Sequence, residues 1–166
     1  MREQGGRTGA ETAVQMAQMM LPSHANPVGN VHGGEIMKMI DDAAGAVAIR
    51  HARGNVVTAS IDRIDFREPV YVGNFVLLRA SVNCVGTSSM EIGVRVEAED
   101  LRTGQVRHTA SAYLTFVALD PSGRPVPVPP LVLETEEQRR RCEAGELRKQ
   151  ERARLRREIQ EAASAR

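Results

Sequence analysis

Four segments between residues 56 and 119 carry the apolar and β-branched patterns of strands. They span residues 56–66, 75–85, 90–99 and 106–119. The third alternates most regularly, because Met90, Ile92 and Val94 begin a run of apolar residues at every second position. Short turns rich in glycine and polar residues separate the segments, among them GTSS at 86–89. The pattern predicts an antiparallel sheet with one buried face.

Residues 35–52 (EIMKMIDDAAGAVAIRHA) follow the period of a helix instead. The stripe that we expect to face the core consists of Ile36, Ile40, Ala43 and Val47. Asp41 projects on an apolar flank of this stripe, whereas Asp42 projects the opposite way, toward solvent. A carboxyl group among apolar neighbours suits acid–base chemistry, so Asp41 is the first candidate catalytic residue.

The segments before the helix and after the last of the four strands are shorter or more polar. Residues 1–11 are polar, and we expect them to form a disordered lead. Residues 12–21 (TAVQMAQMML) predict a strand, although their periodicity also allows a helix. Residues 134–166 predict a charged helix, which is either a solvated helix with frayed ends or a partner-binding tail. The globular domain is therefore expected at residues 12–133.

The order of these elements predicts the fold class. A strand, a loop, a long helix and four further strands indicate an α+β fold with one central helix against an antiparallel sheet. Such a helix covers only one face of the sheet. The other face and the edges need a cover, and a second copy of the chain is the most economical one.

Composition and charge limit the classes of partner. The chain has 166 residues, a formal net charge of +1, two tyrosines, three phenylalanines and no tryptophan. Phosphate-backbone binders usually carry a basic excess and single-strand platforms need aromatic side chains, so nucleic acid is not an expected partner. No apolar run is long enough to span a membrane, and the N-terminus lacks the apolar core of a secretory signal.

The two cysteines, Cys84 and Cys142, lie in very different contexts, an apolar strand and a charged tail. Neither shows the spacing of a metal site or of a disulfide framework. We therefore expect a reduced, cytoplasmic protein without a structural metal.

The loop before the helix concentrates glycine and polar groups. Gly33 and Gly34 stand at the start of the helix, where backbone N–H groups lack helical partners and can bind a carbonyl oxygen or an oxyanion. An ordinary glycine-rich helix entry is the other interpretation. Asp41 lies seven residues after Gly34, about two turns along the helix. It cannot reach an atom bound at its own helix start, but it can reach one delivered by a neighbouring subunit.

Other polar residues near this loop or in turns are weaker candidates. Asn26 precedes Pro27, which holds it extended, so its amide can orient a water molecule, although Asn-Pro is also common in plain loops. His32 acts either as a base or hydrogen-bond donor, or simply as a loop residue. Ser88 and Ser89 offer hydroxyl and N–H groups to a phosphate, or only form a turn. The sequence contains no GxSxG motif of a serine hydrolase.

Several sequence segments resemble those of one enzyme family. They are HANPVGNVHGGEIMKMIDDAAGAVAIRH, VVTASIDRIDFREPVYVGNFV, VGTSSMEIGVRVEAEDLRTG and LDPSGRPVPVPPLVLETEEQRRR. Over residues 12–145 the chain resembles the hotdog-fold acyl-CoA thioesterases, in particular the YciA-type bacterial enzymes and the brain acyl-CoA hydrolase. The resemblance implies an antiparallel sheet wrapped around a long helix, and dimers with a continuous sheet that assemble as trimers of dimers. It implies no cofactor, since coenzyme A is part of the substrate.

The resemblance also assigns roles to residues. It implies that Asp41 is the catalytic carboxylate, that Asn26 comes from the partner subunit, and that backbone N–H groups around Gly34 hold the thioester carbonyl. It gives the GTSS turn a contact with CoA. The substrate-binding candidates are His32, Gly33, Thr58, Ser88 and Ser89.

The expected activity is the hydrolysis of acyl-CoA to a free fatty acid and CoA. Asp41 acts either as the general base for water or as a nucleophile that forms a mixed anhydride, and the sequence leaves both open. A non-catalytic acyl-CoA-binding module with a regulatory role is the alternative. A hotdog hydratase or dehydratase needs a histidine beside the carboxylate, and the next helical histidine, His51, lies ten residues after Asp41.

Overall fold

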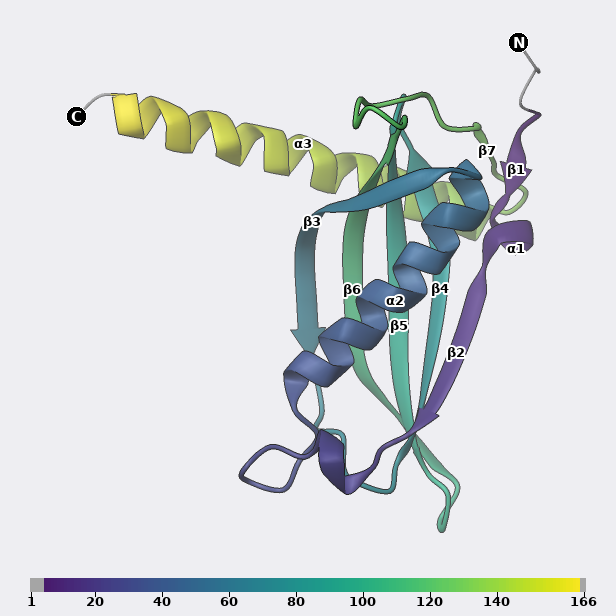
Figure 1. The fold of residues 1–166 in the computed structure, drawn as a ribbon, viewed down its shortest axis with the longest axis vertical. Coiled ribbons are helices and arrows are strands. Elements are labelled where there is room, and N and C mark those ends of the chain that lie inside the picture. Colours follow the sequence, from purple (N-terminus) through teal and green to yellow (C-terminus); the bar gives the residue numbers. More distant parts are fainter. Residues whose placement is uncertain (1–4, 165–166) are drawn as a thin grey trace.

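A 20-residue helix, α2 (Gly33–Ala52), lies against one face of a five-stranded antiparallel sheet (Figure 1). The structure is a computed structural model, and it describes residues 5–164. The strands are β2 (Val14–Met19), β3 (Asn55–Phe66), β4 (Phe75–Val85), β5 (Ser89–Asp100) and β6 (Gln105–Leu119). Their order across the sheet is β2-β4-β5-β6-β3. This is the α+β arrangement that the sequence predicts, and residues 14–19 adopt the strand rather than the helix.

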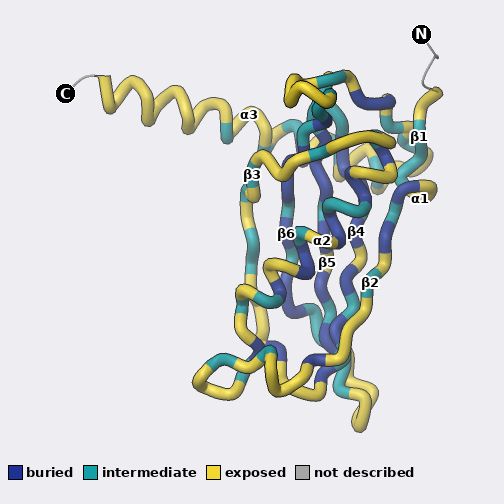
Figure 2. Tube along the Cα trace, viewed as in Figure 1, coloured by how far each residue is buried: buried dark blue, intermediate teal, exposed yellow. Residues whose placement is uncertain are grey.

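The predicted stripe of α2 forms the centre of the core. Its residues, each at most 2% exposed, are Ile36, Ile40, Ala43 and Val47. The alternating residues of β5 face them and are buried as predicted, namely Met90, Ile92, Val94, Val96 and Ala98. Figure 2 shows the buried residues concentrated in the central strands β4, β5 and β6, whereas α2 alternates between buried and exposed residues. The local pattern is therefore enough to fix which face of each element turns inward.

β3 forms one edge of the sheet and has a free side. It pairs with β6, from Asn55 opposite Leu119 to Phe66 opposite Ala110. The pairing has two irregularities, after Thr58 and again after Ile61, and such bulges bend a strand. Within residues 5–164, no strand pairs with the other side of β3, which leaves a 12-residue row of backbone groups open to pairing.

Part of the N-terminal lead is structured, so the prediction of disorder over residues 1–11 is wrong for its second half. β1 (Arg7–Thr8) pairs in parallel with β7 (Leu131–Val132) at the end of the proline-rich segment. The short helix α1 (Gly9–Thr12) follows, with a capping box in which Glu11 accepts from the Thr8 N–H at 2.7 Å. The polar composition of this segment gives no sign of the cap that stabilises this short helix. Residues 1–4 lie outside the described part.

The charged tail forms α3 (Glu136–Ser164), as the sequence predicts, but one face of its first half is docked on the protein rather than solvated. It packs on the face of the sheet opposite α2. Gly145 is buried there, and Arg148 binds Glu91 of β5 through two hydrogen bonds of 2.6 and 3.0 Å. The Arg148 guanidinium also stacks on Tyr113, 3.9 Å from its ring centre. The chain itself therefore covers part of the outer face that the sequence analysis assigned to a second copy.

Docking of α3 also brings the two cysteines together, although the sequence suggests unrelated contexts. Cys84 of β4 is buried and lies near Cys142 of α3, and both are free cysteines. Burial raises the pKa of the Cys84 thiol to about 12, and the negative charge of Glu91 adds to this effect. A buried thiol of this kind is inert rather than reactive.

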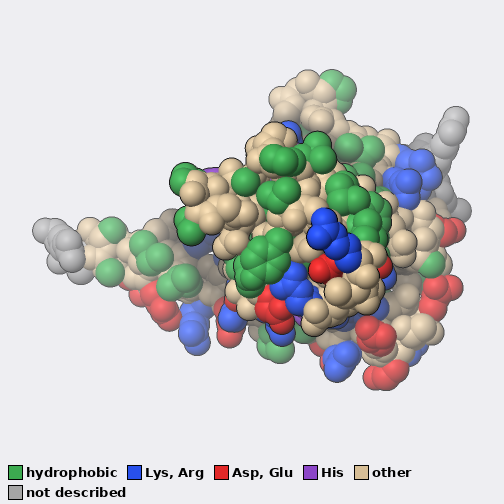
Figure 3. Space-filling view, turned by 90° about the horizontal axis from the view of Figure 1, so that it is seen from below, with side chains coloured by type: hydrophobic (Ala, Val, Ile, Leu, Met, Phe, Trp, Pro, Cys, Tyr) green, Lys and Arg blue, Asp and Glu red, His purple; other side chains and the backbone are tan. Residues whose placement is uncertain are grey.

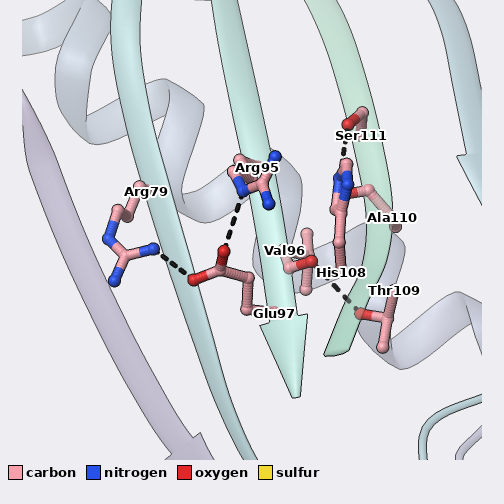
Figure 4. Close-up of polar contacts among 8 residues, drawn as sticks. All are labelled: Arg79, Arg95, Val96, Glu97, His108, Thr109, Ala110 and Ser111. Atoms are coloured by element: carbon pink, nitrogen blue, oxygen red, sulfur yellow. Dashed lines mark hydrogen bonds and ion pairs between the residues drawn. The ribbon is translucent and has the colours of Figure 1, made fainter. Parts of the chain in front are cut away.

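Beside α3, the outer face of the sheet is polar. Glu97 accepts hydrogen bonds from Arg79 on the neighbouring strand and from Arg95 on its own strand, the latter at 2.8 Å (Figure 4). His108 and Ser111 of β6 form a second contact, 2.8 Å long. Glu97 is held charged, because the hydrogen bond from Arg95 lowers its pKa. None of the helices within residues 5–164 is both long and apolar enough to cross a membrane.

Candidate active site

Asp41 is fixed by a neighbour from the edge strand. The hydroxyl of Thr58, near the start of β3, donates a hydrogen bond of 2.8 Å to the Asp41 carboxylate. Asp41 is half-buried and Asp42 is exposed, as the helical pattern predicts. Because Thr58 occupies one carboxylate oxygen, the other is left for a proton or for substrate. The sequence predicts Thr58 as a substrate contact, whereas the structure places it against Asp41.

The side chain of Asn26 has a defined orientation within its loop. Its Oδ1 accepts hydrogen bonds from the backbone N–H groups of Val28 at 3.0 Å and Asn30 at 3.2 Å. This is an Asx-type turn, and it fixes which end of the amide is the oxygen. The amide NH2 forms no hydrogen bond with any described residue. Asn26 is therefore prepared to donate to an oxygen atom from outside its own loop.

The start of α2 differs in one respect from the sequence-based prediction. His32 is the N-cap residue, and its Nδ1 accepts the N–H of Gly34 at 2.8 Å. The Gly34 N–H is therefore not unpaired, since a side chain two residues earlier satisfies it. The neighbouring N–H of Gly33 has no partner among the described residues. Gly33 is thus the freer donor, and His32 has a structural role that its position at the helix start could have indicated.

Asn26 and Gly33 line one cavity, whereas Asp41 and Thr58 lie outside it. The cavity has a volume of about 320 Å³, and Phe66 forms part of its wall close to Gly33. Asp41 is about 12 Å further along α2 than Gly33, at 1.5 Å per residue. Figure 3 shows apolar side chains gathered at this end of the molecule. One chain therefore holds these groups in two separate places. We call the pair of donors, Asn26 and Gly33, the donor half-site, and Asp41 with Thr58 the carboxylate half-site.

The turn with Ser88 and Ser89 lies close to the carboxylate half-site but does not touch it. Ser89 is opposite Val117, which is in turn opposite Val57, the residue before Thr58. Two strand spacings separate the turn from β3, about 10 Å. Within the described residues there is no group of three or more histidine, cysteine or acidic side chains that could hold a metal ion.

Comparison with known proteins now decides the family. The sequence profile of the thioesterase superfamily matches residues 28–105. A Bacillus subtilis protein, YkhA, described as an uncharacterised acyl-CoA thioester hydrolase, is 45% identical over 128 residues, which make up 77% of this chain and 74% of that protein. The chain belongs to the hotdog-fold thioesterase superfamily. The α+β architecture above is thus the hotdog fold predicted from the sequence.

Solved structures of thioesterases extend the similarity over nearly the whole chain. A hexameric acyl-CoA thioesterase superposes with a TM-score of 0.88 at 36% identity, covering 91% of this chain and 97% of that one. The acyl-CoA hydrolase of Staphylococcus aureus, solved with butyryl-CoA, CoA and CoA disulfide, superposes with a TM-score of 0.86 at 32% identity, covering 95% and 96%. Variants of that hydrolase with one aspartate, one asparagine or one threonine replaced by alanine have also been solved.

Proposed function

We propose that the protein hydrolyses acyl-CoA thioesters to a free acid and CoA, with Asp41 as the catalytic carboxylate. The observation that carries this proposal is the hydrogen bond between Thr58 and Asp41, in a chain of a thioesterase superfamily. This hydrogen bond holds the carboxylate in one orientation on the flank of an apolar helix. A group that reacts with a carbonyl needs such a fixed orientation.

Two routes remain open to this carboxylate. As a general base, Asp41 takes a proton from water, the hydroxide adds to the thioester carbonyl, and the tetrahedral intermediate expels CoA thiolate, which takes up the proton. As a nucleophile, its free oxygen attacks the carbonyl, CoA thiolate leaves, and water then cleaves the mixed anhydride. Both routes put negative charge on the carbonyl oxygen, so both need donors near it.

We assign the donors to the other half-site. The amide NH2 of Asn26 and the N–H of Gly33, both without a partner among residues 5–164, line the same cavity, and both can donate to an oxyanion. The Gly34 N–H joins them only if substrate displaces the His32 ring from its cap. Loss of one such donor typically costs about 3 kcal/mol of transition-state stabilisation. Asn26 can also hold the attacking water.

A dimer through the free edge of β3 would complete the site. Pairing of two β3 strands continues the sheet across both copies and brings the carboxylate half-site of one toward the donor half-site of the other. Larger assembly as a trimer of dimers is supported by the hexameric state of a similar thioesterase. We place the CoA arm near Ser88 and Ser89, on the sheet side of Thr58.

The S. aureus variants support this choice of residues. The asparagine, aspartate and threonine replaced in that hydrolase follow one another along its chain at intervals of 15 and 17 residues. Asn26, Asp41 and Thr58 have the same intervals, 41 − 26 = 15 and 58 − 41 = 17.

The mechanism uses no metal or organic cofactor, and the cytoplasmic location stays a prediction.

The test is thiol release from acyl-CoAs of increasing chain length, measured for the wild type, Asp41→Asn and Asp42→Asn. Asp42 is the matched control, because it is an exposed carboxylate next along the same helix. We expect Asp41→Asn to lower kcat by about 1,000-fold and Asp42→Asn to leave it unchanged. Wild-type activity in Asp41→Asn would refute the assignment, and tight acyl-CoA binding without thiol release would instead support the non-catalytic module.

A hydratase or dehydratase finds no support in the structure. His51, the nearest histidine that follows Asp41 in α2, is fully buried, and its Nε2 lies 2.8 Å from the carbonyl oxygen of Pro129. A ring bound in this way cannot meet a reacting carbon beside Asp41.

A further inference from the structure

The distal half of α3, residues 153–164, projects beyond the edge strand β3. Figure 1 shows α3 passing behind the sheet and continuing past β3, and Figure 3, turned by 90°, shows the same segment clear of the body. Every residue of this segment is exposed. The first half is anchored on its own sheet, where Arg152 forms the last contact, an ion pair with Asp62 of β3. The helix thus leaves its own subunit at the edge that we propose as the dimer interface.

The exposed segment continues the face by which the first half is docked. Gly145, Arg148 and Arg152 face the sheet. At about 3.6 residues per turn, the same face leads on to Leu155 and Ile159, which are 56% and 60% exposed. Leu147 is equally exposed, at 61%, but lies about 120° around the helix from Ile159. The apolar residues of the distal half are therefore exposed in a single copy, on the face that would meet a continuation of the sheet.

The outer face of the sheet carries a groove beside α3. It has a volume of about 590 Å³ and extends from Tyr113 of β6 over Arg95 of β5 to Gln15 of β2, and the first turns of α3 form one wall through Glu137 and Arg140. Figure 4 shows Arg95 with its partner Glu97 on this face. No described segment of the chain fills the groove. A helix lying across these strands would run beside α3.

We propose that the distal half of α3 crosses the β3 edge and packs into this groove on a second copy of the chain. The inference rests on the β3-paired dimer of the proposed function. The lengths agree, because 12 helical residues span about 18 Å and strands in a sheet are about 4.8 Å apart. Starting from its own β3, the segment reaches over the partner's β3 and β6 as far as β5. The two-fold symmetry of a dimer makes the exchange reciprocal, so each copy donates one helix and receives another.

The test compares two variants with one added cysteine on the same helix, Ile159→Cys and Leu147→Cys, in the full-length protein, with the native Cys84 and Cys142 kept in both. Each is labelled with a maleimide, and the rate at that position is followed by peptide mass spectrometry. We expect residue 159 to react at least about 10-fold more slowly than residue 147, because burial at an interface blocks the reagent although both helix positions are equally exposed in a single copy. Equal rates in an oligomeric protein would overturn the proposal and leave the proposed activity standing.

A second measurement identifies the occupant. A photo-crosslinking residue in place of Ile159 is irradiated in a mixture of isotope-labelled and unlabelled protein, and sedimentation velocity gives the oligomeric state. We expect mixed-isotope crosslinks to peptides from β5 or β6 (residues 89–119). Crosslinks to α3 or to another surface of the second copy would contradict docking in the groove. A monomer in sedimentation, with residue 159 freely labelled, would overturn both the docking and the proposed dimer.

Discussion

The hydroxyl of Thr58, on the edge strand β3, lies 2.8 Å from the carboxylate of Asp41 on the central helix. This contact joins the two elements whose relative position decides where the carboxylate points. It also places the candidate base at the free edge of the sheet, within reach of a second copy.

Replacement of Thr58 tests whether this contact orients Asp41. Thr58→Val keeps the shape and removes the hydroxyl, so we expect kcat to fall by about 10-fold or more, the value of a hydrogen bond to a charged group. Thr58→Ser keeps the donor and should retain most of the activity. Steady-state kinetics of thiol release would measure both, and a loss in Thr58→Ser with full activity in Thr58→Val would mean that the methyl group matters rather than the hydroxyl.

Mixing of inactive subunits tests the division of the site between two chains. Asp41→Asn and Asn26→Ala homodimers should each be nearly inactive. After exchange of subunits at equal amounts, half of the dimers are mixed, and each mixed dimer carries one site without either substitution. We therefore expect about a quarter of the wild-type activity to return. If Asn26 and Asp41 served the same site from one chain, no mixture would recover activity.

Two helical glycines give opposite expectations for the same substitution. A Cβ on Gly145 would lie 2.6 Å from the Cys84 Sγ and 2.9 Å from Glu91, so Gly145→Ala should push α3 from the sheet and lower the free energy of unfolding by about 1–2 kcal/mol. A Cβ on Gly45 meets only Phe116, at an ordinary 3.8 Å. Gly45→Ala should therefore stabilise the protein by about 0.5–1 kcal/mol, which urea unfolding of both variants would show.

The burial of His51 leads us to expect that the protein loses stability at acidic pH. Its burial lowers its pKa below the ordinary value of 6.5, so the folded state holds the ring neutral where the unfolded chain begins to bind a proton. The free energy of unfolding should fall as the pH drops below about 6.5. His51→Gln keeps a donor for the Pro129 carbonyl and does not titrate, so the difference between wild type and variant should shrink toward acid. A constant difference between neutral and acidic pH would contradict this account.

The burial of Cys84 leads us to expect a loss of stability at alkaline pH. Its folded-state pKa is raised from 9.0 to about 12, so above pH 9 the unfolded chain releases a proton that the folded state keeps. Stability contributed by this thiol is therefore lost as the pH rises through that range. Cys84→Ala should flatten the alkaline limb of the stability profile. Rapid alkylation of Cys84 in the native protein at about pH 8.5 would show that the thiol is not buried as described.

The sequence revealed those parts of the fold that local periodicity determines. The stripe of α2 from Ile36 to Val47 and the alternation of β5 are visible within short windows, because each residue's neighbours on a helix or strand are near in sequence. Asp41 was found for the same reason, since its flank of the helix is defined by residues within one or two turns. The positions of these residues follow from the pattern alone.

The parts that the sequence did not reveal depend on single contacts between distant segments. Glu91 and Arg148 are 57 residues apart in the sequence. Neither belongs to an apolar pattern from which their pairing could be predicted. This pair is one of the contacts that dock α3 on the sheet, together with the buried Gly145 and the ion pair of Arg152 with Asp62. The cap that His32 provides to Gly34 is local, yet it depends on the orientation of one ring, which composition does not encode.

The open edge of β3 has a consequence for any assay of this protein. If the site forms between two copies as proposed, a single chain holds only half of each site, and activity requires two chains to associate. Below the dissociation constant of the dimer, the rate should rise with the square of the protein concentration rather than in proportion to it. Dilution alone would then switch the enzyme off, without unfolding it and without any inhibitor.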